Sequence, residues 1–555
     1  MRMKDSVYAE ELDLLEEIAA KYGISGTIRQ KIAQCRQSID DFSLKVPVVG
    51  RFSAGKSALL NALLERELLA EDQGPETAVP CELVYDDNEY VELIGGPQGD
   101  ARCPIAEIGQ RDASSYQYLR YHIRHDFLRK NKDYILVDMP GLDSGIAEHN
   151  KAIMQYIGRG NAYILVVDCE DGEIKSSSID FLREIKQYEH NLAIVVSKAD
   201  KKPAGQVAEI VEQVRQTAAA IFEKDIVAVS ASKFDNVVPQ MEQVLSSFQI
   251  NDIRAQVFAP QIAELAHLEL AAVKQFAQSR HFDDRELTEK ISMHQKARER
   301  LVSLLEKERN KLAQKIRQQV KPGIIADVQN VLYANSAALA SSLAAGGNAF
   351  TRTVNDLLRP VLIASTNRYT EASYQEFVRQ INFGQVLDND KLAAEIAAKY
   401  KAIMSSLQKM LAATDNAKGI YRSITSILAI TTTVVAPWLE LIIVFLPDIL
   451  KLFGGLVEKS RMEQLRRQVE TEIIPQIAAK LSLEMDESLR ELEANLIEEL
   501  EAKMNDLIEA ETDSLMAAQR LKQQQEAAYA EAQRETSEDI HRLESLLQTL
   551  QPAMT

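Results

Sequence analysis

The spacing of apolar residues divides the chain into a first part with strand patterns and a second part with helical patterns. Residues 43 to about 250 alternate short apolar runs, rich in β-branched residues, with helical runs, which predicts an α/β domain with a mostly parallel sheet. Residues 5–41 predict one or two helices, broken near Gly23 and Gly26. From about residue 255 the chain is rich in Ala, Leu, Gln, Glu and Lys and predicts long helices.

These patterns predict three parts: an N-terminal helical segment at 1–42, the α/β domain at 43–250, and a long all-α neck and stalk at 251–555. We expect an antiparallel stalk, and a last helix at about 505–550 that meets the N-terminal helices as a neck. Turns or hinges are expected at Pro322-Gly323, at Gly346-Gly347-Asn348 and near Gly384. An apolar stripe with spacings of three and four predicts a bundle seam at Leu481, Met485, Leu489, Leu492, Leu496, Leu500, Met504 and Leu507.

A strongly apolar stretch at residues 424–457 differs from the rest of the helical region and contains the only tryptophan, Trp438. Pro437, Glu440 and Pro447 interrupt it, whereas a single membrane-spanning helix needs ~20 continuous apolar residues. Basic residues flank the stretch at Lys418, Arg422, Lys451, Lys459 and Arg461. Two interpretations stay open: a short helical hairpin at 418–460 with an exposed apolar tip, or a hairpin buried in the stalk core.

Size, charge and cysteine content narrow the classes of function. A chain of 555 residues is too long for one core and predicts two or three domains. The net charge of −18 argues against a general nucleic-acid binder, because phosphate contacts need a basic surface. The four cysteines are scattered without a C-x-x-C pair, so neither a zinc site nor a disulfide framework is expected. The N-terminal residues predict no secretory signal.

Residues 50–57, GRFSAGKS, match the phosphate-loop pattern G-x-x-x-x-G-K-[ST] between an apolar strand run and a helical run. Such a loop wraps a polyphosphate with backbone N–H groups at the N-terminus of a helix. Lys56 would reach the β- and γ-phosphates, and the Ser57 hydroxyl would coordinate Mg²⁺. The sequence therefore predicts a nucleoside triphosphate site, and the other loop residues expected around the phosphates are Gly50, Ser53, Ala54, Gly55 and Ala58.

A second motif, D-M-P-G, begins at Asp138, where an apolar strand run ends. In phosphate-loop NTPases an acidic residue at this place holds Mg²⁺, here through water, and the glycine N–H contacts the γ-phosphate. Thr77, in the sequence GPETAVP, is the candidate for a further Mg²⁺ ligand in a mobile loop that touches the γ-phosphate. We therefore expect Ser57, Thr77 and Asp138 at the metal and Gly141 at the γ-phosphate.

A third motif predicts the base. The sequence SKAD, with Ser197, Lys198 and Asp200, is similar to the [NT]-K-x-D element of GTPases, with serine in the first position. In that element the carboxylate accepts hydrogen bonds from guanine N1–H and the 2-amino group, and the lysine stem packs over the ring. Adenine would leave Asp200 unpaired, at a cost on the order of 1–3 kcal/mol. Ser230 and Ala231 follow the next strand run, where GTPases place a loop whose backbone contacts the guanine oxygen.

With these motifs the chain resembles the dynamin superfamily, and within it the bacterial dynamin-like proteins, most closely the compact LeoA type. Three stretches carry the resemblance: GRFSAGKS, TAVP and DMPGLDSG. Helical segments before and after the GTPase domain agree with it. The resemblance implies a GTPase that binds GTP or GDP with Mg²⁺, dimerises through its nucleotide face, assembles further, and remodels membranes as a peripheral protein in the cytoplasm.

Carried over by position, Ser53 would bind a charge-compensating monovalent cation, and Lys56, Thr77 and Gly141 would complete the catalytic set. Phe52 departs from the pattern, because eukaryotic dynamins have a glutamine there that positions the attacking water, and phenylalanine cannot hydrogen-bond water. Hydrolysis by a monomer is therefore expected to be slow. The resemblance also implies that the tip at 418–460 enters lipid. The alternative is a GTP-gated scaffold that recruits protein partners without inserting in a membrane.

Overall fold

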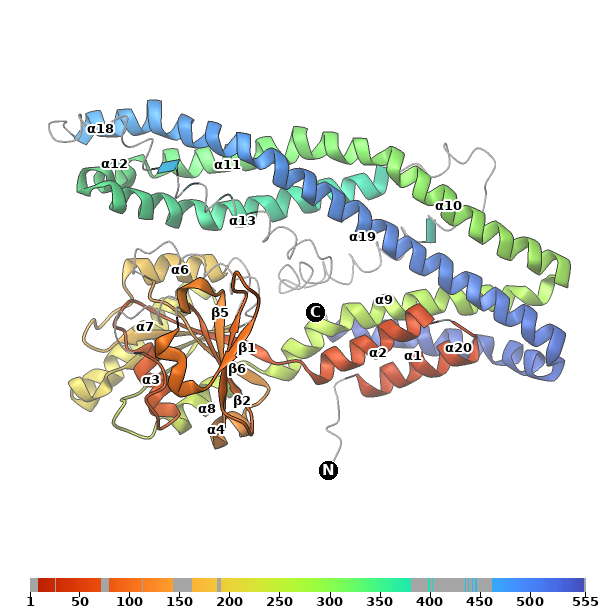
Figure 1. Cartoon of the computed structure of the whole chain (residues 1–555), viewed down its shortest axis with the longest axis horizontal. Helices are drawn as coiled ribbons and strands as arrows, with labels where there is room; N and C mark the ends of the chain where they lie inside the picture. The colour runs from red at the N-terminus through yellow and green to blue at the C-terminus, as the bar shows by residue number, and fades with distance from the viewer. Residues whose placement is uncertain are drawn as a thin grey trace.

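The computed structural model combines an α/β domain with long helices that run beside it (Figure 1). This arrangement confirms the prediction of a mostly parallel α/β domain followed by a helical region. The residues that the structure describes are 8–24, 26–70, 79–111, 113–142, 162–186, 191–380 and 462–553, with the separate positions 398, 399, 402, 435, 438, 442, 445 and 446.

The described strands of the α/β domain form one sheet in the order β4-β3-β5-β2-β6-β1-β7-β8-β9. Its central part is parallel: β1 (Leu44–Val49) lies between β6 (Tyr134–Asp138) and β7 (Ala162–Asp168), and β8 (Asn191–Ser197) and β9 (Val227–Ser230) follow. These strands have buried residues facing both sides, which explains their continuous apolar sequence. Their carboxyl ends meet at one edge of the sheet.

The other end of the sheet contains antiparallel pairs. β2 (Cys81–Tyr85) is antiparallel to β6 and parallel to β5 (Tyr118–Ile123), and β3 (Tyr90–Ile94) is antiparallel to β5 and to β4 (Ala101–Cys103). Alternate residues of β5 are buried, as expected for strands that pack on one face.

Helices cover both faces of the sheet and separate two apolar cores. α6 and α7 pack on one face, and α3, α4 and α8 pack on the other. The helical elements of this domain are α3 (Lys56–Leu63), α4 (Asp126–Lys130), α6 (Ser176–Lys186), α7 (Ala204–Phe222), α8 (Val238–Ser246), and the 3₁₀ turns Ile105–Gln110, Ala113–Ser115 and Ala199–Lys201.

Four of the described helices, next to the α/β domain, form the neck: α1 (Ala9–Lys21), α2 (Gly26–Asp40), α9 (Ile250–Gln278) and α20 (Glu526–Ala553). The predicted break lies between α1 and α2, at Gly23, whose φ is +65°. A buried carboxylate on α20, Asp539, ties the N-terminal helix to the C-terminal one. It accepts hydrogen bonds from the Lys21 ammonium at 2.6 Å and the Tyr22 hydroxyl at 2.7 Å.

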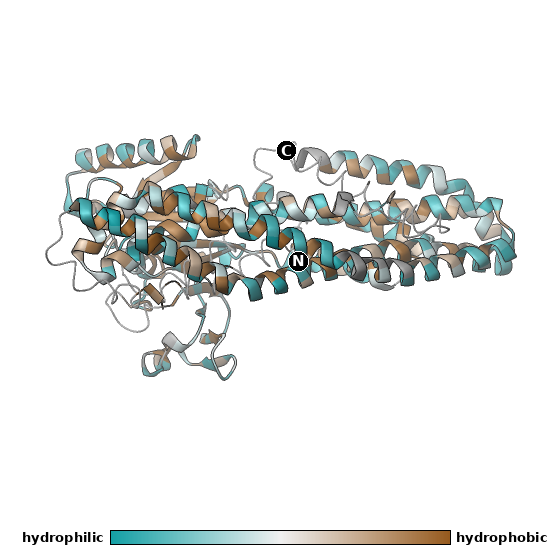
Figure 2. Cartoon of the chain, turned by 90° about the horizontal axis from the view of Figure 1, so that it is seen from above, coloured by the Kyte–Doolittle hydropathy of each residue, from teal (hydrophilic) through white to brown (hydrophobic). Residues whose placement is uncertain are grey.

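Beyond the neck, the chain turns at the 3₁₀ segment Ser279–His281 and runs back as the stalk (Figure 1). The predicted apolar stripe on α19 is buried throughout, as a bundle seam requires. Hydrophilic and hydrophobic residues are interleaved along each long helix (Figure 2). The stalk elements among the described residues are α10 (Asp284–Lys315), a π-helical turn (Ile316–Val320), α11 (Lys321–Ala334), α12 (Ser336–Ala345), α13 (Gly347–Gln380), α18 (Met462–Gln468), a second π-helical turn (Val469–Ile473) and α19 (Ile474–Gln524).

The structure corrects one predicted break and bears out another. No turn occurs at Pro322-Gly323, because a π-helical turn precedes the proline and the helix continues through it. A wider turn makes room for a proline ring that would otherwise clash with the preceding carbonyl, and the same device precedes Pro475. The break at Gly346 is present between α12 and α13, with a φ of +121°. Gly384 lies outside the described residues.

The last helix also differs from the expectation of one helix at about 505–550. α19 ends at Gln524 and α20 begins at Glu526, so the chain turns back at Gln525. The sequence around this turn, QQQEAA, has no glycine or proline to mark it. The segment that packs in the neck therefore begins after the turn.

The prediction of an exposed apolar tip within residues 418–460 is contradicted at every position of that stretch that the structure describes. Val435, Trp438, Ile442, Phe445 and Leu446 are buried and belong to the core of the helical region. Burial removes these side chains from water just as lipid would, so the composition alone did not separate the two interpretations. Leu439 lies outside the described residues. Within the part of the chain that the structure describes, no helix has the length and apolarity to cross a membrane.

Glu269 of α9 gives a test of the neck core. Its side chain is fully buried, and neither carboxylate oxygen has a hydrogen-bond partner among the described residues. Burial, together with the nearby charge of Glu16, raises the pKa of Glu269 well above its ordinary value. A raised folded-state pKa means that stability is highest below the unfolded-state value and falls as the pH rises through the folded-state value.

We therefore expect Glu269→Gln to raise the free energy of unfolding at pH 8 by ~1–3 kcal/mol, with a smaller gain at pH 5. Urea denaturation at both pH values measures this change. Glu209→Gln, at an exposed glutamate of α7, is the matched control. Equal stability of Glu269→Gln and wild type at pH 8 would contradict the prediction.

Candidate nucleotide-binding site

A cavity of about 440 Å³ opens at the carboxyl ends of the central strands. The phosphate loop, the D-M-P-G segment and the SKAD segment border it, because each follows one of these strands. Gly50, Ala54 and Ser230 do not line this cavity, and Thr77 lies outside the described residues. The predicted site residues that line it are Ser53, Gly55, Lys56, Ser57, Ala58, Asp138, Gly141, Ser197, Lys198, Asp200 and Ala231.

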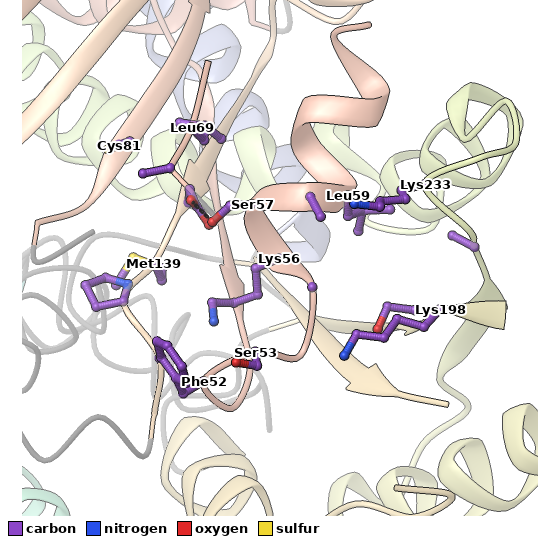
Figure 3. Close-up of a pocket in the computed structure, with 18 of the residues that line it drawn as sticks. Phe52, Ser53, Lys56, Ser57, Leu59, Leu69, Cys81, Met139, Lys198 and Lys233 are labelled. Carbon is purple, nitrogen blue, oxygen red and sulfur yellow. Dashed lines mark hydrogen bonds between the residues drawn. The ribbon is translucent and has the colours of Figure 1, made fainter. Parts of the chain in front are cut away.

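The phosphate loop connects β1 to α3 and curls around the amino group of Lys56. Gly55 has a φ of +88°, and a Cβ at Gly50 would lie 2.5 Å from the carbonyl oxygen of Val166 on β7, so the loop needs both glycines. The buried Lys56 ammonium donates hydrogen bonds to the carbonyl oxygens of Gly50, at 3.3 Å, and Arg51, at 3.1 Å. Figure 3 shows its side chain in the middle of the cavity.

Ser57 and Asp138 form a pair of oxygen ligands beside Lys56. The Ser57 hydroxyl donates a hydrogen bond to Asp138 Oδ2 at 2.6 Å, whereas Asp138 Oδ1 is buried without a partner among the described residues. Burial raises the pKa of Asp138 to about 6, although the Lys56 charge and the Ser57 hydrogen bond lower it. A hydroxyl and a buried carboxylate with an unused oxygen fit Mg²⁺, which prefers oxygen ligands and would compensate the buried charge.

The D-M-P-G segment lies directly against the phosphate loop. A Cβ on Gly141 would come within 2.9 Å of both Cα and N of Phe52, so only glycine fits there. The next residue, Leu142, donates its N–H to the Gly50 carbonyl at 3.1 Å. Phe52 itself is 42% exposed at the cavity and offers no polar group.

The base side of the cavity is joined to the phosphate loop by Ser197. Its hydroxyl donates to the Ala54 carbonyl at 2.5 Å and lies 3.2 Å from the Val167 carbonyl. Asp200 Oδ1 accepts a hydrogen bond from the Ser232 hydroxyl at 2.9 Å, so the side chain of Ser232 supports this carboxylate. Ser230 is the last residue of β9.

Sequence reasoning missed three residues on this side. Asp168 accepts a hydrogen bond from Lys198, and Lys233 and Phe234 line the cavity, Phe234 with 74% exposure. In Figure 3, Lys198 and Lys233 lie on one side of Lys56, and Phe52 and Met139 lie on the other. Asp168 had the same sequence signal as Asp138, because both end an apolar strand run.

A parallel sheet with a phosphate loop after its first strand, a D-M-P-G segment after β6 and a SKAD segment after β8 defines a phosphate-loop GTPase domain. Residues 46–200 match the dynamin family. The chain therefore contains a dynamin-family GTPase domain, as predicted. The closer likeness to the compact LeoA type stays a prediction.

Similar proteins are distant in sequence. Dynamin-like protein A of Bacillus subtilis is 25% identical over 180 residues, 31% of this chain and 14% of that protein. A probable chloroplastic transmembrane GTPase, FZO-like, of Arabidopsis thaliana is 25% identical over 217 residues, 39% of this chain and 21% of that protein. The matched part of this chain spans between 14% and 53% of the length of the curated relatives.

Among solved structures, an oligomerised bacterial dynamin pair, described as a mechanism for the long-range sensing and tethering of membranes, is 13% identical. The match covers 100% of this chain and 84% of that one, with a TM-score of 0.41.

The buried carboxylate of Asp138 allows a test of the proposed Mg²⁺ site. We expect Asp138→Asn to weaken Mg²⁺-dependent nucleotide binding about tenfold or more, because the buried carboxylate is lost. The nucleotide-free variant should be at least as stable as wild type above pH 7, since a pKa raised to about 6 means that the ionised carboxylate costs stability there.

Titration of Mg²⁺ with a fluorescent guanine nucleotide measures the first effect, and thermal melting measures the second. Asp126→Asn, at a carboxylate that is 91% exposed and does not line the cavity, is the control. If Asp138→Asn needs the same Mg²⁺ concentration as wild type for nucleotide binding, Asp138 is not a metal ligand.

Proposed function

We propose that this protein binds GTP with Mg²⁺ in the described cavity and hydrolyses it to GDP and phosphate. The observation that carries the proposal is the convergence of Lys56, the Ser57–Asp138 pair and Asp200 on one cavity. In this proposal Lys56 holds the β- and γ-phosphates, Ser57 and Asp138 hold Mg²⁺, and Asp200 pairs with guanine. Thr77 would join the metal from residues 71–78.

The chemistry of the loop supports slow hydrolysis by a single copy. Phe52, which contacts Gly141 where the γ-phosphate would lie, cannot position a water molecule. We propose that a second copy, facing the nucleotide, completes the site and that Ser53 supports a monovalent cation there. Ser53 has a φ of +61°, a strained conformation that turns the loop at this point.

For the whole chain we propose a GTPase domain at 43–250, flanked by a helical neck and stalk, that self-associates with GTP and acts peripherally on membranes from the cytoplasm. Membership of residues 46–200 in the dynamin family supports this proposal. A second candidate is a GTP-gated scaffold that recruits protein partners. The burial of Trp438, Phe445 and Leu446 favours this second function, because no apolar tip is exposed at these positions.

Base selectivity tests the GTP proposal directly. We expect wild type to bind GTP and not ATP. Asp200→Asn should lose affinity for GTP about tenfold or more and gain affinity for xanthosine triphosphate, whose 2-oxo group accepts the hydrogen bond that an amide can donate. Competition binding with both nucleotides measures the exchange. Asp235→Asn, at an exposed residue of the neighbouring loop, is the control. Equal binding of ATP and GTP by wild type would refute the proposal.

Trp438, the only indole, separates the two candidate functions of the whole chain. Because it is buried, its emission should be blue-shifted without nucleotide and unchanged by liposomes. Quenching by brominated lipids only with GTP, and not in Lys56→Ala, is the result expected of the membrane-active protein. Absence of quenching in every nucleotide state, with GTP still bound, would leave the scaffold function.

A further inference from the structure

We infer that Asp168 is a positioning residue for the nucleotide base, because its carboxylate holds Lys198 in the place where the lysine stem lies along one face of guanine. This inference deepens the proposed function and rests on it, since it concerns the same cavity. Asp168 does not line the cavity and acts through Lys198.

Sheet register brings the two residues together. β7 and β8 are parallel, and Asp168, the last residue of β7, lies opposite Ser197, the last residue of β8. Lys198 follows directly with a φ of +53°, a left-handed conformation that turns its side chain out of the strand direction. Its ammonium donates to Asp168 Oδ2 at 2.6 Å, and the two side chains are 33% and 15% exposed.

The carboxylate is itself held in place. Asp168 Oδ1 accepts the N–H of Glu170 at 2.8 Å, and the N–H of Cys169 bonds to the Ser197 carbonyl at 3.1 Å. One oxygen of Asp168 is therefore used to fix its own turn, and the other is directed at Lys198. Such an arrangement orients a partner rather than merely neutralising it.

A lysine stem has high rotational freedom, and a base-stacking surface works only when that freedom is lost. The contact with Asp168 orders the Lys198 side chain before the nucleotide binds. Nucleotide binding therefore does not have to offset the loss of side-chain conformational entropy. Because Lys198 contacts the base and not the phosphates, the gain in affinity should be equal for GTP and GDP. In this proposal Asp200 alone recognises the hydrogen-bonding edge of guanine.

Asp168→Asn tests the inference, because the amide oxygen still accepts from Glu170 while the charge that attracts Lys198 is lost. We expect affinity for GTP and GDP to fall by the same factor, about tenfold, as for a lost charge-assisted hydrogen bond. Glu173→Gln removes one negative charge from the same loop, at a residue that pairs with Lys175, and should change neither affinity.

A double-mutant cycle separates positioning from a structural role. Lys198→Met keeps an apolar stem without the ammonium, so Asp168→Asn should have no further effect on binding in that background. The same loss in both backgrounds, or no loss in the single variant, would overturn the inference. Thermal melting identifies a variant that simply unfolds. If wild type fails to select guanine, the proposed function itself fails; if it selects guanine and Asp168→Asn binds normally, only this inference fails.

Discussion

The candidate site depends on the parallel pairing of β1 with β6 and β7. The register places Val48 opposite Asp138, so the metal-side carboxylate ends its strand beside the first turn of the phosphate loop. On the other side, β7 comes so close that a Cβ at Gly50 would collide with the Val166 carbonyl. A loop held between two strands in this way has little freedom, and its N–H groups can be aimed at a phosphate without further ordering.

Much of this site could be predicted because its residues follow strand ends, and strand ends can be recognised in sequence. Lys56, Ser57, Asp138 and Asp200 each belong to a motif in which spacing carries the chemistry. The contact between Asp168 and Lys198 could not be predicted in the same way, since it depends on which strands become neighbours. The hydrogen bond from Ser232 to Asp200 depends on the course of the loop after β9, for which the sequence pattern gives no signal.

The helical region shows where pattern reasoning fails for a different reason. A proline normally marks the end of a helix, but a π-helical turn before Pro322 lets the helix continue. At Gln525 the chain turns without any breaker residue, because packing of α20 on α9 and α1 determines the turn. The burial of Trp438 is a further example. An apolar sequence predicts that a segment is removed from water, but tertiary packing determines whether it contacts protein or lipid.

The length of α19 has a mechanical consequence. Its 51 residues form an uninterrupted α-helix of about 75 Å at 1.5 Å per residue. In its C-terminal half, Asp506 pairs with Lys31 of α2, and in its N-terminal half Asp486 pairs with Lys321 of α11. One rigid rod is thus fastened to the neck and to the stalk. A tilt of a few degrees imposed at the neck would become a displacement of several ångströms at the remote end of the stalk, so α19 has the geometry of a lever arm.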